Sequence, residues 1–266
     1  MMPARGGMRL LRSEIWRTSR STALLGGLAL YALFAGILLG VPSMADARVN
    51  PERWAASEPD IWVQVAAGAG MIGGLLVAVI AMVFTASEFS WGTIRLQMAT
   101  GLSRRDIFAA KFLQGAFIAV AFFAVTLLVS VILAGALPVA WSAGLAGGAA
   151  GIRAAAIVLS SFLLFAALGV SKGFLVPHPG AALAVAVGYA IAVEPALYQA
   201  LVILDWIPEH QAVLPLRSLG RLHTVPVLGG GRSGNVNAAT PLLLVTTAWA
   251  TLVFAGSWWR FTRKDL

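Results

Sequence analysis

The chain has 266 residues, of which 59% are hydrophobic and 11% are charged. Soluble domains carry roughly 25% charged residues, and the mean hydropathy of +0.85 is high. The composition therefore excludes a soluble protein and indicates an integral membrane protein. The absence of Cys excludes disulfides, thiolate metal sites and thiol catalysis.

Six apolar runs are long enough to cross a membrane, which takes about 20 residues. They predict an all-α polytopic protein with spans at 22–41, 61–86, 112–137, 154–171, 181–204 and 238–258. The runs are apolar on every side, which excludes a transmembrane barrel of alternating strands. The sequence "SMADA" after the first run is similar to a signal-peptide cleavage site. The basic N-terminal segment that precedes the run, however, is long for a signal peptide. Glycines four apart, such as Gly70 with Gly74, predict close helix packing.

The cations predict the orientation, because short cytoplasmic loops carry an excess of Lys and Arg. With the N-terminus inside, 13 of the 19 basic residues and four of the 11 acidic residues lie on the inner side. Both termini are therefore expected in the cytoplasm. Topology accounts for the net charge of +8, so no nucleic-acid partner is expected. Sixteen Arg against three Lys favours a GC-rich bacterial genome, and with it a bacterial cytoplasmic membrane.

The stretch "SEFSWGTIRLQMATGLSRRDIFAAKF", residues 87–112, gathers six charged residues between two uncharged runs. Within it, Thr93 is a candidate helix N-cap and Gly101 a candidate left-handed residue after the helix end. Ser103, with Asp106 three residues later, predicts a capping box that starts the third membrane helix. We therefore expect a helix, a stop and a second helix in the loop 87–111. The alternative is a solvated loop that only anchors the topology.

The order Glu, Gly-Thr-x-Arg, Ser-Arg and Lys in this stretch resembles permease subunits of ABC-2-type, or type V, ABC exporters. The residues assigned to coupling are Glu88, Gly92, Thr93, Arg95, Ser103, Arg104, Arg105 and Lys111. The resemblance implies that 93–100 is a coupling helix, which docks on a separate ATP-hydrolysing subunit. It also implies a complex of two permeases, identical or different, with two ATPases. This chain would then form half of the translocation pathway.

The first 21 residues are basic and amphipathic, with Met8, Leu11, Ile15 and Thr18 in a stripe at helical spacing. We expect a helix lying flat on the inner leaflet, and the resemblance implies the same interfacial elbow helix. A disordered basic tail is the alternative.

The chain has no G-x-x-x-x-G-K-[ST] phosphate-binding loop. ATP and Mg²⁺ are therefore expected in the partner ATPase, and no enzymatic activity or cofactor is expected here. The three His lack metal-ligand spacing, so no metal site is expected either.

Glu194 is the one acidic residue inside a predicted span, and Pro195 follows it. A carboxylate at this depth is a functional candidate. In one interpretation Pro195 breaks the fifth helix, the segment up to residue 204 turns back as a re-entrant pair on the outer side, and Glu194 caps the break. In another, Glu194 faces the translocation path. In a third, it lies among the headgroups at an outward-shifted helix end.

The outer loop 205–237 is the longest segment between predicted spans. Arg217 and Arg221 lie one helical turn apart in it and are candidates for closing the outer mouth, with a solvated surface loop as the alternative.

The sequence thus predicts an exporter permease, with two alternatives. One is an ion-driven secondary carrier with Glu194 as its proton site, although inverted repeats are not evident. The other is an ATPase-coupled immunity or sensing subunit without transport, which needs the same coupling loop. Drugs, peptides, lipid-linked sugars and ions all remain open as substrates.

Overall fold

The computed structural model describes residues 4–37, 61–136, 148–204 and 239–263, together with Leu214, Pro215 and Ser218. Every main element in this part of the chain is helical. Five helical segments are long and apolar enough to cross a membrane: Gly70–Ser90, Arg104–Leu133, Ala155–Leu175, Pro179–Ile203 and Thr240–Arg263. The chain is therefore a polytopic all-α membrane protein, as the composition predicted.

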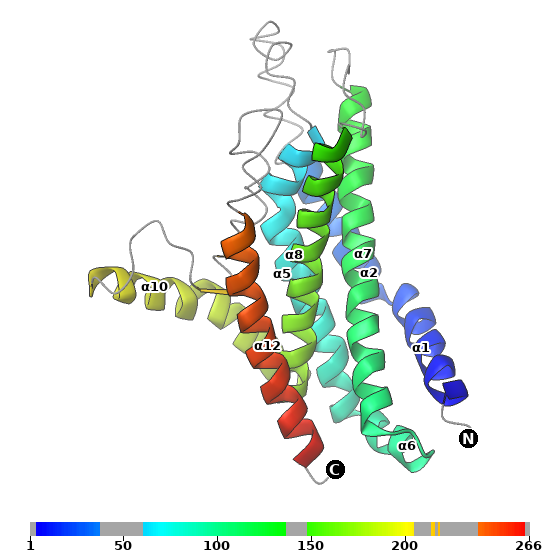
Figure 1. Ribbon diagram of the computed structural model, residues 1–266. Helices are drawn as coiled ribbons and strands as arrows, with labels where there is room; N and C mark the ends of the chain where they lie inside the picture. Colours follow the sequence, from blue (N-terminus) through cyan, green and yellow to red (C-terminus); the bar gives the residue numbers. More distant parts are fainter. Residues whose placement is uncertain are drawn as a thin grey trace, which may run out of the picture.

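The helices α2 (Thr22–Ala35), α5 (Ile61–Ser90), α7 (Arg104–Ala136), α8 (Gly148–Leu175) and α12 (Ala239–Arg263) run alongside one another as a bundle (Figure 1). Helix α8 packs against α5, α7 and α12 and is the central helix of the group. Helix α1 (Ala4–Ser19) lies beside α7. The start of α1, the short helix α6 (Thr93–Ala99) and the end of α12 lie at one end of the bundle, which we call the α6 end (Figure 1).

Aromatic side chains fill the middle of the bundle around Tyr31 of α2. Its ring lies 5.3 Å from that of Phe122 and 6.5 Å from that of Phe162, measured between centroids. Its hydroxyl forms a 2.9 Å hydrogen bond with the Thr126 hydroxyl. All four side chains are fully buried. Because lipid gives helices little hydrophobic reason to associate, such packing and interhelical hydrogen bonds hold the bundle together.

Helices α5 and α8 approach closely where α8 carries Gly169 and Gly173. A Cβ atom at Gly169 would lie 2.3 Å from the backbone oxygen of Ala78, and one at Gly173 would lie 2.8 Å from that of Met82. These two glycines are four residues apart and therefore share one face of α8. The helix contact is closest along that face. Gly74 of α5, predicted as a packing position, is also in this helix contact, where a Cβ would lie 2.3 Å from the Phe165 ring of α8.

The first predicted span, 22–41, corresponds to α2. The Ser21 side chain caps α2 by accepting a 3.2 Å hydrogen bond from the Leu24 backbone N–H. The helix is apolar but has only 14 residues in its α-helical part, and residues 38–41 lie outside the described part of the chain. Five helices are therefore long enough to cross a membrane in the described part, and the sixth span stays a prediction.

Helix α5 continues to Ser90, beyond the predicted end of the second span at residue 86. Helix α7 begins at Arg104, where the predicted Ser103 cap places its start, and so extends in front of the apolar span that begins at residue 112. Most of the loop 87–111 is helical, as the predicted order of helix, stop and second helix requires. Hydropathy locates the apolar part of a helix and misses its polar extensions.

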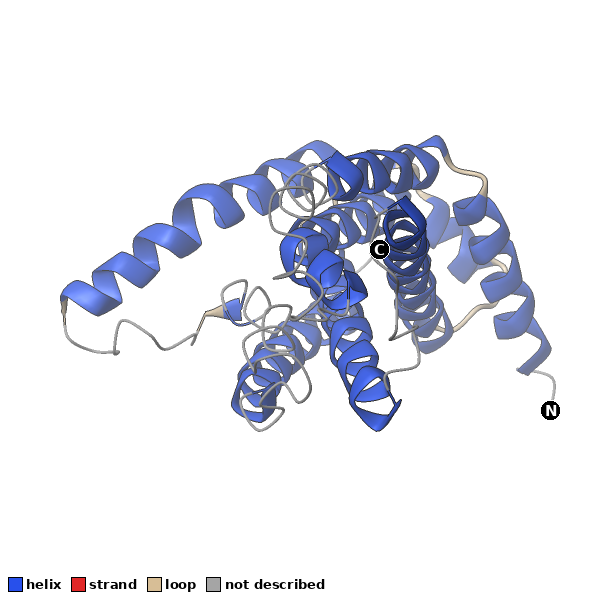
Figure 2. Cartoon of the chain, turned by 90° about the horizontal axis from the view of Figure 1, so that it is seen from above, coloured by secondary structure: helices blue, strands red, loops and turns tan. Residues whose placement is uncertain are grey.

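The fifth segment is one continuous helical run of α9 (Pro179–Gly188), the π-helical turn η2 (Tyr189–Val193) and α10 (Glu194–Ile203). The predicted break at Pro195, with a chain reversal before residue 204, is wrong. Proline lacks an N–H and its ring clashes with the carbonyl four residues earlier. The π turn widens the helix just before Pro195, with the Glu194 N–H bonded to the Tyr189 carbonyl, and so accommodates the ring. The run lies crosswise to the bundle helices, and its α10 end projects from the side of the bundle (Figures 1 and 2).

Candidate functional site

Two left-handed glycines bracket α6 and turn the chain between α5 and α7. Gly92, with φ of +68°, precedes α6, and Gly101, with φ of +87°, follows it. Glycine adopts this backbone region without the steric cost of a Cβ. The prediction for Gly101 is confirmed. The prediction that Thr93 is the N-cap is wrong, because Gly92 takes that position and no side chain caps the helix.

Ser103 caps the start of α7, as predicted. Its hydroxyl accepts a 3.1 Å hydrogen bond from the Asp106 N–H and donates a 2.7 Å hydrogen bond to the Asp106 carboxylate. The arrangement is a variant of the predicted capping box, in which the Asp106 carboxylate accepts from the Ser103 hydroxyl instead of from the Ser103 backbone N–H. The stretch after α5 is therefore a helical hairpin in which a short helix, α6, leads into a long one.

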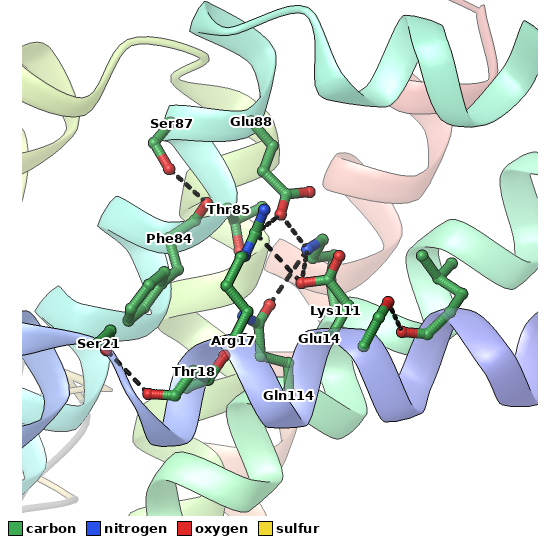
Figure 3. Close-up of polar contacts among 12 residues, drawn as sticks. Glu14, Arg17, Thr18, Ser21, Phe84, Thr85, Ser87, Glu88, Lys111 and Gln114 are labelled. Atoms are coloured by element: carbon green, nitrogen blue, oxygen red, sulfur yellow. Dashed lines mark hydrogen bonds and ion pairs between the residues drawn. The ribbon is translucent and has the colours of Figure 1, made fainter.

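Four charged side chains meet beneath this hairpin: Glu14 and Arg17 of α1, Glu88 of α5 and Lys111 of α7 (Figure 3). We call them the charge cluster. Lys111 lies at its centre, with Nζ 2.8 Å from Glu14 Oε2 and 2.6 Å from Glu88 Oε1. Arg17 forms ion pairs with the same two carboxylates. Each cation thus bridges both acids.

Neutral side chains extend the charge cluster across the α1–α7 contact. Lys111 also donates a 3.2 Å hydrogen bond to Gln114 Oε1. Gln114 Nε2 in turn donates a 2.6 Å hydrogen bond to the Thr18 hydroxyl (Figure 3). Thr18, Lys111 and Gln114 are all buried. Helix α1 is therefore fixed against α7 by polar contacts rather than by an apolar stripe.

Three of the four side chains of the charge cluster are almost fully removed from solvent. The side chains of Glu88 and Lys111 are 0% exposed and that of Glu14 is 4% exposed, whereas that of Arg17 is 41% exposed. Two positive and two negative charges leave no net charge, which burial requires because an unpaired buried ion costs several kcal/mol. Glu88 Oε2 is buried without a hydrogen-bond partner among the described residues.

Helix α6 is held to the charge cluster on one face and exposed on the other. Gln97 Nε2 donates a 3.4 Å hydrogen bond to Glu14 Oε1, and Ile94 is buried in the core. Arg95 and Leu96 are exposed, as is Trp91 just before the helix. The hairpin thus has a buried root and an outward face that combines apolar and cationic side chains.

Arg104 connects the root of α7 to the end of α12. Its Nη1 donates hydrogen bonds of 2.7 Å to the Phe261 carbonyl and 2.8 Å to the Thr262 carbonyl. The last carbonyls of a helix lack partners within it and attract cations. The neighbouring Arg105 is exposed.

The residues assigned to coupling differ in their exposure, with Gly92, Thr93 and Arg104 half-buried. Glu88 and Lys111 are buried together inside the molecule, whereas Arg95, Ser103 and Arg105 are exposed at the α6 end. Sequence reasoning missed Glu14, Arg17 and Gln114. One signal was available: Glu14 is the only acid in a basic helix, and a lone acid that is turned inward needs buried cations. Of the predicted stripe Met8, Leu11, Ile15 and Thr18, only Thr18 is buried in the bundle, whereas Leu11 and Ile15 are half-buried and Met8 is exposed.

Glu194 lies in a second polar site, beside Lys172 of α8 and Tyr189 of η2. It is buried, attracts Lys172 electrostatically and forms a hydrogen bond with the Tyr189 side chain. Lys172 Nζ also lies 4.3 Å from the centroid of the Tyr189 ring. The sequence did not predict that Lys172 and Glu194 lie together. The segment 179–203 lies across the bundle and places Glu194 beside α8.

An apolar pocket of about 150 Å³ adjoins this second site between α5, α8 and the segment from α9 to η2. Leu75, Met82 and Phe165 are among its apolar lining residues, and Lys172 and Tyr189 supply its polar groups. Pro195 is exposed and makes no part of the lining. The other predicted gate residues, Arg217 and Arg221, lie outside the described part of the chain.

No model of a known protein family matches the chain, and no curated protein matches it. The geometry of the α6 hairpin and of the charge cluster is therefore the main basis for a functional assignment.

Proposed function

We propose that the chain is the permease subunit of an ATP-driven exporter, coupled through α6 to a separate ATPase. The observation that carries the proposal is the α6 hairpin, which has an exposed outer face and a root fixed by the buried charge cluster. A helix that passes movement from a soluble motor to membrane helices needs both properties. It must be reachable by the motor, and it must be rigidly joined to the helices that move.

The charge cluster provides the rigid connection. Glu88 lies two residues before the end of α5, and Lys111 lies in the third turn of α7. The ion pair between them, with 2.6 Å between Lys111 Nζ and Glu88 Oε1, joins the two helices that flank α6. Glu14 adds α1 to the same group. A force on α6 would thus reach three helices together rather than bending a flexible loop.

The exposed face of α6 has the character of a protein-docking surface. Leu96 is 67% exposed and Trp91 is 72% exposed, and Arg95 lies beside Leu96. Interfaces are enriched in aromatic residues and Arg. In the proposed complex this face contacts the ATPase, which binds ATP and Mg²⁺. Two ATPases and a second permease, identical or homologous, complete the exporter.

The proposal places the α6 end in the cytoplasm of a bacterium, with both termini and six spans across the inner membrane. The cation distribution supports this orientation, because the exposed arginines Arg95, Arg105, Arg260 and Arg263 all gather at the α6 end. Movement of α5 and α7 would then open and close a path between the two permeases.

Copurification from the native host tests the proposal. The tagged full-length chain is extracted in mild detergent and its partners are identified by mass spectrometry. We expect an ATPase with a phosphate-binding loop in stoichiometric amount, lost with Arg95→Glu or Leu96→Asp in a protein that still inserts. Arg260→Glu is the matched control, because Arg260 is also an exposed arginine at the α6 end but lies on α12.

Two results would overturn the proposal. The first is recovery of the chain alone from several detergents. The second is equal recovery of the ATPase with Arg95→Glu, Leu96→Asp and the wild-type chain, which would remove α6 from the contact.

The second polar site favours one other function, an ion-driven carrier. The Glu194 carboxylate is buried near Lys172 and next to an apolar pocket. A carboxylate in this setting can bind and release a proton or a cation during transport. This function predicts that proteoliposomes containing only this chain conduct protons, and that Glu194→Gln abolishes the flux. Absence of flux from the wild-type chain alone excludes it.

A further inference from the structure

The exposed face of α1 carries apolar and cationic side chains in alternation, one per helical turn. Met8, Arg12 and Trp16 of α1 and Arg20, in the turn directly after the helix, are spaced four residues apart, and all four are exposed, Met8 at 74% and Trp16 at 59%. We call this set the α1 stripe. Residues four apart lie one above the other on a helix, so the stripe forms a continuous surface. Leu10, Glu14 and Thr18 form the opposite, buried face, with Glu14 and Thr18 bonded to α7.

The α1 stripe has no acidic residue to oppose its cations. Glu14 is the only acid in α1, and Lys111 and Arg17 hold it inside the charge cluster. Neither Arg12 nor Arg20 forms a hydrogen bond or ion pair with any other residue that the structure describes. The Arg20 guanidinium carbon lies 4.3 Å from the centroid of the Trp16 ring. Stacking on the ring orders the guanidinium while its N–H groups can still bind an anion.

We propose that the α1 stripe is a binding surface for anionic phospholipid headgroups of the leaflet at the α6 end. The guanidinium groups of Arg12 and Arg20 would donate hydrogen bonds to lipid phosphates, which Arg recognises with two parallel N–H groups. Met8 and Trp16 would enter the boundary between headgroups and acyl chains, where Trp is favoured. This surface follows from the membrane setting of the chain and does not depend on any ATPase.

The charge complementarity selects the lipid class. A cation near a charged membrane surface contributes about five-fold in affinity for each Lys or Arg. A zwitterionic lipid offers the same phosphate but also carries a compensating positive group. The two arginines of the stripe therefore predict enrichment of anionic over zwitterionic lipid, which falls with rising salt because surface charges are screened.

The absence of Cys makes a direct measurement possible, since Ser13→Cys gives a unique labelling site. Ser13 is exposed next to Arg12, and its hydroxyl only donates a hydrogen bond to the Leu10 carbonyl of the same helix. A fluorophore at this position is placed in nanodiscs that contain phosphatidylcholine and phosphatidylglycerol at equal mole fractions. Two samples are compared. In the first the phosphatidylcholine carries a quenching spin label near its headgroup, and in the second the phosphatidylglycerol carries it. The ratio of the two quenching efficiencies measures local enrichment.

We expect phosphatidylglycerol to be enriched several-fold around the label, and Arg12→Gln with Arg20→Gln to return the ratio to one. Arg95→Gln with Arg105→Gln is the matched control, since it also removes two exposed arginines at the α6 end, and it should leave the ratio unchanged. A ratio of one in the wild-type arginine background would overturn the proposal. Equal loss of enrichment in the control pair would also overturn it, because general surface charge would then be the cause.

Discussion

Replacing Lys111 by Met is the most direct test of the charge cluster. Methionine is an unbranched side chain that replaces the apolar stem of Lys but lacks the terminal ammonium group. Lys111 Nζ contacts Glu14 Oε2 at 2.8 Å, Glu88 Oε1 at 2.6 Å and Gln114 Oε1 at 3.2 Å. After the change, two nearly unexposed carboxylates share only Arg17. The buried group then carries one net negative charge.

The expected loss of stability follows from that uncompensated charge. Removing one partner of a buried ion pair costs about 3–5 kcal/mol. Arg17 cannot fully replace Lys111, because its side chain is 41% exposed and already bridges both acids. For a chain of this size each kcal/mol lowers Tm by about 2–4 °C, which predicts a decrease of roughly 6–20 °C.

Thermal unfolding in detergent, followed by loss of monodisperse protein, measures the effect. Glu88→Gln combined with Lys111→Met restores equal numbers of buried cations and anions, so the double variant should be more stable than the sum of the single changes predicts. Arg95→Met serves as the control, because Arg95 is an exposed cation at the same end of the bundle. If Lys111→Met lowers Tm no more than Arg95→Met does, the charge cluster does not hold the helices together.

Two glycine substitutions test the backbone requirements by the same assay. Gly169→Ala places a Cβ 2.3 Å from the Ala78 carbonyl oxygen and should destabilise the chain by about 1–3 kcal/mol, whereas Gly256→Ala meets no atom within 4 Å and should stabilise α12 by up to about 1 kcal/mol. Equal effects at the two positions would contradict the close approach of α5 and α8. Gly101→Ala forces a Cβ into a backbone with φ of +87° and should cost about 1–2 kcal/mol. Faster amide hydrogen exchange in α6 would show that the lost stability lies at this turn, whereas unchanged exchange in α6 would contradict the requirement for glycine at position 101.

The membrane class and the α6 hairpin could be predicted from the sequence because local signals determine both. Long apolar runs require helices in lipid, and Gly101 and Ser103 are positioned by turn and cap chemistry that involves only near neighbours. The extension of α5 to Ser90 and the burial of the polar residues at the near ends of α5 and α7 could not be predicted in the same way. Hydropathy does not detect a helix that continues through polar residues such as Glu88 and Lys111, which become buried only when α1 packs over them.

Long-range contacts explain the other differences. The pairing of Glu14 with Lys111 joins residues that are far apart in the chain, and no local pattern marks it. The pairing of Glu194 with Lys172 was missed for a similar reason. It depends on the direction of the α9–α10 segment relative to α8, which no local sequence pattern specifies. The close contact at Gly169 and Gly173 was missed because glycine pairs are frequent in this chain and spacing alone does not select among them.

Helix α1 occupies a special place in this arrangement because its two faces have different partners. One face exposes the α1 stripe, and the other inserts Glu14 between Lys111 and Gln97. Helix α6 is short and has few contacts of its own, so the Gln97–Glu14 hydrogen bond and the buried Ile94 largely determine how it sits against the bundle. A displacement of α1 would therefore move Glu14 and disturb the support of α6 directly. The position of α1 and the orientation of α6 are thus linked through the Glu14 carboxylate.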